Sequence, residues 1–288
     1  MKNEKMNKGL LDSQLILDEK KRLNEQWKDI GISNDFVFCK VMQDKELLSE
    51  LIRRILPDLE FTDLKIDGQK TIEIGPDIHG VRFDVFATME DGRIVDIELQ
   101  VLNTGNLPKR IRYYGSIADM QMLEKGVVYD ELVESYVVMI CLFDLYGEGR
   151  HMYTFTNRCK ENPELEMGDG TTRIVLNATG TKDGISPKLK AFLSYVAGNA
   201  VEDEYVKKLD DAVQKARQNK KWRNEYMVIY MRDLEQQRIG REQGKEEQKR
   251  EHIAEMLQDG KTPEEIASFC KYPMTLIEEV QKSIMSVK

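Results

Sequence analysis

Two adjoining extended segments, VRFDVFATM (81–89) and RIVDIELQV (93–101), carry acidic residues whose spacing could do chemistry. In the second segment, every second residue from 96 to 100 is polar and the residues between them are apolar; the polar residues are Asp96, Glu98 and Gln100. Such alternation commonly marks a strand with one face in water. What these side chains can do therefore depends on the residues that the preceding strand places opposite them.

The loop between the two segments, residues 90–92, decides this register. A two-residue loop would set polar residues opposite apolar ones, so the apolar residues of the two strands would not share one face of the sheet. A three-residue loop with a left-handed glycine instead pairs Met89 with Arg93 and places Asp84 directly opposite Glu98. This second register gathers the apolar residues on one face: Val81, Phe83, Val85, Ala87, Val95, Ile97, Leu99 and Val101.

Two carboxylates side by side favour a metal site. Opposed side chains stand about 5 Å apart at Cβ, so adjacent carboxylates repel each other unless a positive charge lies between them. Mg²⁺ or Mn²⁺ would suit Asp84, Glu98 and a strand carbonyl such as that of Leu99, because these ions prefer oxygen ligands and keep waters that can act as nucleophiles. The alternative is an ordinary wet face on which the acids pair with Arg82.

The pattern around the hairpin predicts an α/β fold with a mixed central sheet flanked by helices. A helix capped by Ser33 or Asn34 is expected to run to Leu56-Pro57. A second helix, residues 108–125, should follow the hairpin. The remaining expected elements are strands at 61–66, 70–74, 136–144, 151–157 and 171–178, and a helix at 187–196.

Composition shifts predict four regions. Residues 1–30 form an N-terminal extension, 31–200 the α/β domain, 201–251 a charged helical linker and 252–288 a compact helical tail.

The tail is expected to hold three short helices in a helix-turn-helix-like arrangement, at 253–257, 263–269 and 276–283. Capping boxes at 262–265 and 275–278 would start the last two. Glu278 and Glu279 stand near the start of the final helix, where DNA contacts would be made and where acids repel phosphate. Protein contact or self-association is therefore favoured for the tail.

Composition also limits the function classes. The chain has 288 residues, of which 41 % are hydrophobic and 33 % charged, and its longest apolar run is too short to cross a membrane, so we expect a cytoplasmic protein without membrane contact. The net charge of −8 argues against coating nucleic acid by bulk electrostatics. Four scattered cysteines and three isolated histidines suggest neither a zinc site nor a disulfide framework.

Several segments occurring in order resemble a known family. They are NDFVFCKVM, RFDVFATMEDGRIVDIELQV, PKRIRYYGSIADMQMLEKGVVYDEL and YVVMICLFD, followed by a charged tail. Together they resemble the PD-(D/E)XK nuclease family transposases, also called recombination-promoting nucleases of the Rpn type. The resemblance extends over nearly the whole chain beyond residue 30.

The resemblance implies a restriction-endonuclease-like core and a DNA endonuclease that depends on Mg²⁺ or Mn²⁺. Asp84 and Glu98 would bind the metal. Gln100 takes the place of the lysine of the motif and would hold the attacking water, but a neutral amide cannot supply the missing cation. Arg110 or Lys109 would supply it at the phosphate.

Two further residues have alternative roles. Tyr114, one turn after Arg110, either lines the site or packs in the core. Asp35 is either an additional acidic site residue or part of the helix cap.

Two function classes follow. The first is a DNA endonuclease linked to recombination or mobile elements, which could form a homo-oligomer through its C-terminal helices. The second is a catalytically inactive, nuclease-like protein that acts as a DNA-binding or protein-interaction module. The intact set of Asp84, Glu98 and Gln100 favours the enzyme, whereas the acidic net charge and the absent lysine keep the second alternative open.

Overall fold

The computed structural model describes residues 16–68, 71–72, 81–122, 128–182 and 184–286. The chain forms two compact units, Met1–Arg223 and Asn224–Lys288. Residues 16–28 are helical. The elements that follow are α2 (Asp35–Val41), α3 (Lys45–Ile55), β1 (Leu64–Gly68), β2 (Thr71–Ile72), β3 (Val81–Arg82), β4 (Val85–Met89), β5 (Ile94–Gln100), α4 (Leu107–Met122), a 3₁₀ turn (Tyr129–Glu131), β6 (Ser135–Cys141), β7 (Met152–Phe155), β8 (Thr171–Asn177), α5 (Pro187–Val196), α6 (Glu204–Gln218), α7 (Lys220–Gln258), α8 (Pro263–Cys270) and α9 (Met274–Ser286).

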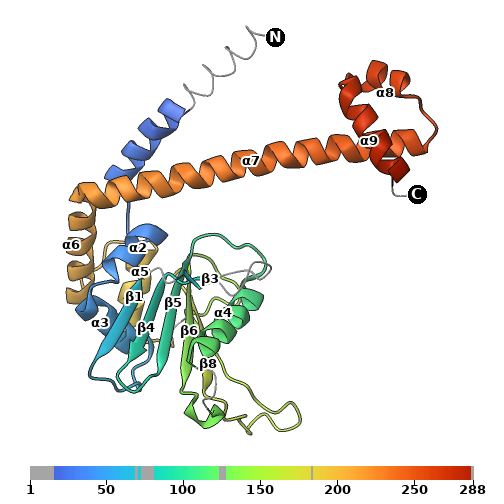
Figure 1. Cartoon of the computed structure of the whole chain (residues 1–288). Coiled ribbons are helices and arrows are strands. Elements are labelled where there is room, and N and C mark those ends of the chain that lie inside the picture. The colour runs from blue at the N-terminus through green and yellow to red at the C-terminus, as the bar shows by residue number, and fades with distance from the viewer. Residues whose placement is uncertain (1–15, 69–70, 73–80, 123–127, 183, 287–288) are drawn as a thin grey trace. The chain divides into compact units, whose positions relative to one another are not determined.

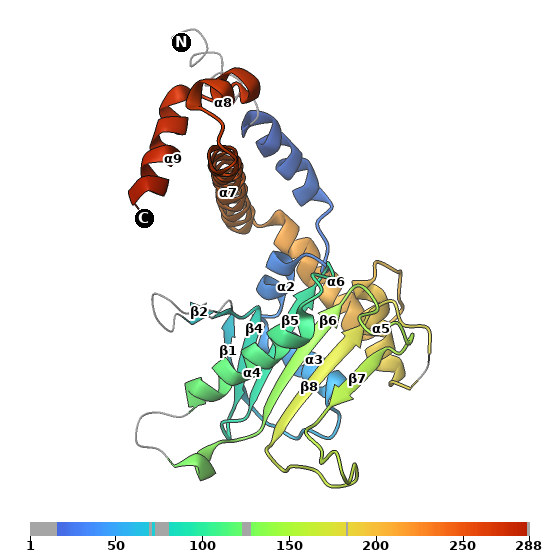
Figure 2. The ribbon, with the colours of Figure 1, turned by 90° about the vertical axis from the view of Figure 1, so that its right-hand side faces the viewer.

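The first unit is built on a six-stranded mixed sheet with the order β1-β4-β5-β6-β8-β7. The central strands β5, β6 and β8 are parallel, and the outer strands pair antiparallel. Helix α4 lies across one face, whereas α2, α3 and α5 lie on the other (Figure 1, Figure 2). This arrangement confirms the predicted α/β fold with flanking helices.

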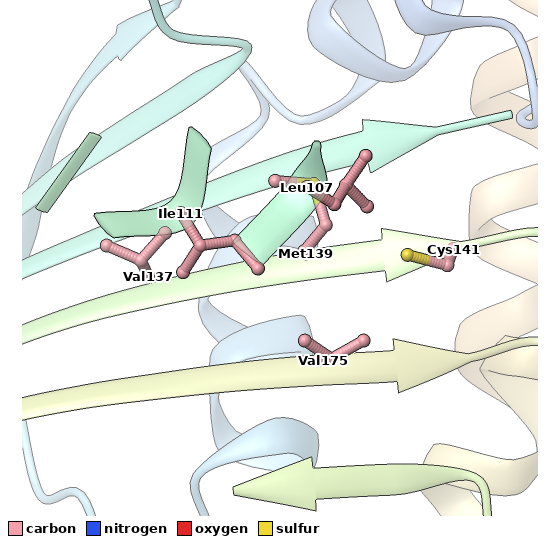
Figure 3. Close-up of a cluster of buried hydrophobic side chains, with 6 residues drawn as sticks. All are labelled: Leu107, Ile111, Val137, Met139, Cys141 and Val175. Atoms are coloured by element: carbon pink, nitrogen blue, oxygen red, sulfur yellow. The ribbon is translucent and has the colours of Figure 1, made fainter. Parts of the chain in front are cut away.

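Helix α4 is held on the sheet by an apolar cluster (Figure 3). Leu107 and Ile111 project from the helix onto side chains of β6 and β8. The strand residues of this cluster are Val137, Met139, Cys141 and Val175. Because α4 covers this face and α2 contacts β5 on the other, every residue of β5 except Gln100 is buried.

The β4–β5 hairpin has the predicted register. Val85 pairs with Ile97 and Ala87 with Val95, and the Met89 N–H donates to the Arg93 carbonyl at 2.8 Å. Gly92 has the expected left-handed conformation, with φ of +89°. The three-residue loop therefore sets Asp84 and Glu98 at the same end of the sheet.

Two expectations about this region are wrong. The single helix predicted from Asn34 to Leu56 is two helices, because the Asp44 side chain accepts the N–H groups of Glu46 and Leu47 and caps a new helix. The single strand predicted for 81–89 is likewise broken at residues 83–84, which belong to no strand.

That break moves Phe83 to the other face of the sheet. It was expected beside Val85, but it packs with Phe86, Ile94 and Ile117 on the side of α4. The expected strand 70–74 and the expected helix end at 125 lie partly outside the described residues.

Some of the elements after the sheet agree with those expected from the sequence. Helix α5 has the predicted bounds, and α6 packs on α2, α3 and α5, which extends the first unit beyond residue 200. The predicted domain boundaries remain predictions. No helix among the described residues is both long and apolar enough to cross a membrane.

In the second unit, the end of α7 packs with α8 and α9 around Ile253, Ile266 and Ile277. Thr262 and Glu265 form the predicted capping box. The second expected box is wrong, because Thr275 lies inside α9 and the Pro273 carbonyl accepts the first helical N–H groups.

Replacing Gly92 tests the hairpin register. We expect Gly92→Ala to lower the free energy of unfolding by about 1 kcal/mol, because its nearest new contact, to Val133 at 3.8 Å, is harmless and only the left-handed backbone is strained. The measurement is urea unfolding, with Gly31→Ala as the control at a position without positive φ. An equal effect of both substitutions would contradict this account of the loop.

Candidate active site

The carboxylates of Asp84 and Glu98 are linked through the backbone at the carboxyl end of β5. The Asp84 N–H donates to Glu98 Oε1 at 2.8 Å, and the Leu99 N–H donates to Asp84 Oδ2 at 3.1 Å. The N–H and C=O of one strand residue point to the same neighbouring strand. The Leu99 carbonyl therefore points to the same edge of β5 as its N–H, which Asp84 accepts.

Burial gives these carboxylates unusual acidities. Burial, and then repulsion from Asp84, raises the pKa of Glu98 to about 8. Burial also raises the pKa of Asp84 to about 6, and the Leu99 N–H and Arg82 offset this only in part. The expectation of a wet face is wrong, because the Glu98 side chain is buried beneath α4 rather than solvated.

Asp96 is the most deeply buried acid in this group. It is 0 % exposed, and its carboxyl group lies within hydrogen-bonding reach of the Glu98 carboxyl group. Its strand neighbours Phe86 and Val137 belong to the apolar clusters beneath α4. Burial, followed by repulsion from Glu98 and Asp84, raises its pKa far above the ordinary value.

Arg110 brings a cation to the same end of the sheet from the first turns of α4. Its Nη1 donates to Gln100 Oε1 at 2.7 Å, and its Nη2 donates to the Tyr114 hydroxyl at 3.1 Å. The pKa of Arg110 is raised, since the bond to Tyr114 and the charges of Glu98 and Asp84 outweigh burial. Lys109, the alternative cation, is exposed.

Helix α2, on the other face of the sheet, brings two residues near Asp84, namely Asp35 and Cys39. Asn34 caps the helix by accepting the Val37 N–H at 3.3 Å, and Asp35 Oδ1 accepts the Phe36 N–H at 2.7 Å, so both residues satisfy donors at the start of the helix. Asp35 lies close enough to Asp84 for its charge to raise the pKa of Asp84, and the Cys39 thiol donates a hydrogen bond to Asp84. Asp35 and Cys39 are four residues apart and share one helix face.

The structure thus gathers Asp84, Glu98, Leu99, Gln100, Arg110 and Tyr114 at one end of the sheet. Tyr114 packs in the core, with its ring 5.5 Å from that of Phe83, and its hydroxyl accepts from Arg110; its expected role in lining the site stays a prediction. Sequence reasoning assigned no role to Asp96 or Cys39. The sequence did contain a signal for each. Asp96 is two residues from Glu98 and so shares its strand face, and Cys39 is four residues from Asp35 and so shares its helix face.

The oxygen donors of Asp84, Glu98 and Leu99 meet some of the requirements of a hard divalent cation such as Mg²⁺. Among the described residues, no group of three or more His, Cys, Asp or Glu side chains is assembled for a metal ion. Mg²⁺, however, is commonly bound by one or two carboxylates and keeps several waters. Asp84, Glu98 and the Leu99 carbonyl meet that smaller requirement, and the repulsion between the two acids favours a cation.

One comparison with known proteins gives a match. Residues 32–165, which include every residue of the candidate site, match the family model described as PD-(D/E)XK nuclease family transposase. The match supports the assignment of residues 32–165 to this family. Searches of curated proteins and of solved structures gave no match. The match suggests a nuclease-related function for this part of the chain.

The raised pKa of Glu98 predicts a pH-dependent gain in stability on substitution. Between the ordinary value of 4.5 and about 8, folded Glu98 keeps a proton that the unfolded chain has lost, so stability falls as pH rises. In EDTA, we expect the Tm of Glu98→Gln to exceed that of the wild type by a margin that grows by roughly 5 °C between pH 6 and 9.

The control is Glu90→Gln on the same hairpin. Glu90 is exposed, and its pKa is lowered by the N–H of Thr62. Its ionisation is complete in both states above pH 6, so its effect on Tm should be constant over the same range. A constant margin for Glu98→Gln would contradict the assigned burial of its charge.

Proposed function

We propose that this protein is a metal-dependent endonuclease that hydrolyses DNA phosphodiester bonds and acts in recombination or on mobile elements. The observation that carries the proposal is the linked pair of half-buried Asp84 and buried Glu98 at one end of the sheet, close enough to Arg110 for their charges to raise its pKa. The family match supports the nuclease class.

The residues have complementary roles in such a reaction. Asp84, Glu98 and the Leu99 carbonyl would hold Mg²⁺ or Mn²⁺. When bound, the cation would supply an activated water and would stabilise charge that develops on the phosphate. Arg110 contacts the phosphate and stabilises its negative charge, while Tyr114 keeps the guanidinium in place. Asp35 adds negative charge at the same edge and strengthens the attraction for a cation.

A second candidate function is a catalytically inactive, nuclease-like module that binds DNA or protein. The observation that favours it is that Asp84 and Glu98 each already accept a backbone N–H, at 3.1 and 2.8 Å. With pKa values raised to about 6 and 8, both would carry protons over part of the neutral range. Cation binding and cleavage separate the two candidates.

Plasmid cleavage tests the proposal. Purified wild-type protein should nick supercoiled DNA with Mg²⁺ or Mn²⁺ and not with EDTA. Asp84→Asn and Glu98→Gln remove a negative charge without changing side-chain size, so each should lower the rate on the order of 100-fold or more. Glu90→Gln, at the far end of the hairpin, should cleave normally. Metal-independent nicking, or equal rates in all four proteins, would overturn the proposal.

Metal affinity should depend on pH. Because Glu98 must release its proton to bind a cation, the association constant for Mn²⁺ should rise roughly tenfold from pH 6.5 to 7.5, with about one proton released. Isothermal calorimetry in buffers of different ionisation enthalpy measures both quantities. Binding that is independent of pH, or that persists in Glu98→Gln, would exclude Glu98 as a ligand.

A further inference from the structure

Gln100 has both ends of its side-chain amide occupied within the chain. Its Oε1 accepts from Arg110 at 2.7 Å, and its Nε2 donates to the Leu102 carbonyl at 2.8 Å. A guanidinium only donates and a carbonyl only accepts, so the partners themselves fix which end of the amide is oxygen. The orientation of Gln100 is therefore determined by its neighbours.

The guanidinium of Arg110 is held from two elements at once. Tyr114, one turn later on α4, accepts its second hydrogen bond at 3.1 Å and places a ring 5.4 Å from the guanidinium carbon. Gln100 holds it from the end of β5. The other N–H groups of Arg110 remain for a ligand, as judged from the described part of the chain.

We propose that Gln100 is a positioning residue that acts through Arg110, holding its guanidinium beside Asp84 and Glu98, and that it does not bind the attacking water. This inference rests on the proposed nuclease function and changes the role that the sequence predicted for Gln100. A lysine at position 100 could not take this role, because it has no acceptor for Arg110 and would repel it. The cation of the site thus comes from α4, and the strand supplies its acceptor.

The first test measures the order of the Arg110 side chain and does not require activity. We expect Gln100→Met, which preserves size and removes the acceptor, to lower the order parameter of the Arg110 Nε–Hε group to below about 0.6 by NMR relaxation. The matched control is Gln214→Met on α6, because Gln214 accepts from Arg217 at 3.5 Å. That control should leave Arg110 unchanged.

The second test is a double-mutant cycle on cleavage. If Gln100 acts only through Arg110, then Gln100→Met and Arg110→Met each lower kcat, and the double variant is no slower than Arg110→Met alone. A water-binding Gln100 would instead give effects that multiply. Gln100→Lys alone should cleave more slowly than the wild type. The double variant Gln100→Lys/Arg110→Met should cleave faster than Arg110→Met, because its lysine supplies a cation that no arginine repels.

The outcomes are distinguishable. A mobile Arg110 in Gln100→Met, together with a non-additive cycle, supports the positioning role. An Arg110 that stays ordered, or effects that multiply, overturns it. If the wild type cleaves nothing with either metal, the proposed function fails, while the order parameter still decides whether Gln100 positions Arg110.

Discussion

Burial of like charges is the constraint on which this structure depends. Asp84, Asp96 and Glu98 lie at and near the carboxyl end of β5. Asp84 raises the pKa of both Asp96 and Glu98, and Glu98 also raises that of Asp96. Charges withdrawn from water are costly unless they are paired with the opposite charge. Without a cation, protons reduce the repulsion; in the proposed function, Asp84 and Glu98 would instead serve as ligands of a cation. The acidity of the site and its proposed chemistry thus have one cause.

The fold explains how these acids come to be buried. β5 is a central strand, so helices cover both of its faces, and α4 lies over the face that carries Asp96 and Glu98. In open α/β sheets, ligands bind at the carboxyl ends of the strands. Here α4 brings Arg110 to that end and α2 brings Asp35. Segments far apart in the sequence therefore meet where β5 ends.

Local rules predicted much of this from the sequence. The glycine in the hairpin loop and the alternation of apolar residues were enough to give the register of the β4–β5 ladder and to bring Asp84 near Glu98. They did not predict the bend at Asp84, because it reflects contacts of Phe83 with α4. Nor did they predict the burial of Asp96, since alternation marks one face of a strand as polar but does not say what covers it. The contact between Arg110 and Gln100 likewise depends on how α4 crosses the sheet.

The most direct measurement of the central claim is the position of a bound cation. A crystal of the protein soaked in Mn²⁺ at pH 8.5, above the pKa of Glu98, would locate the ion by its anomalous scattering. The account predicts a single strong peak between the carboxylates of Asp84 and Glu98, next to the Leu99 carbonyl, and its loss in Glu98→Gln. A site without a peak at this pH, or a Mn²⁺ ion bound only elsewhere, would contradict it.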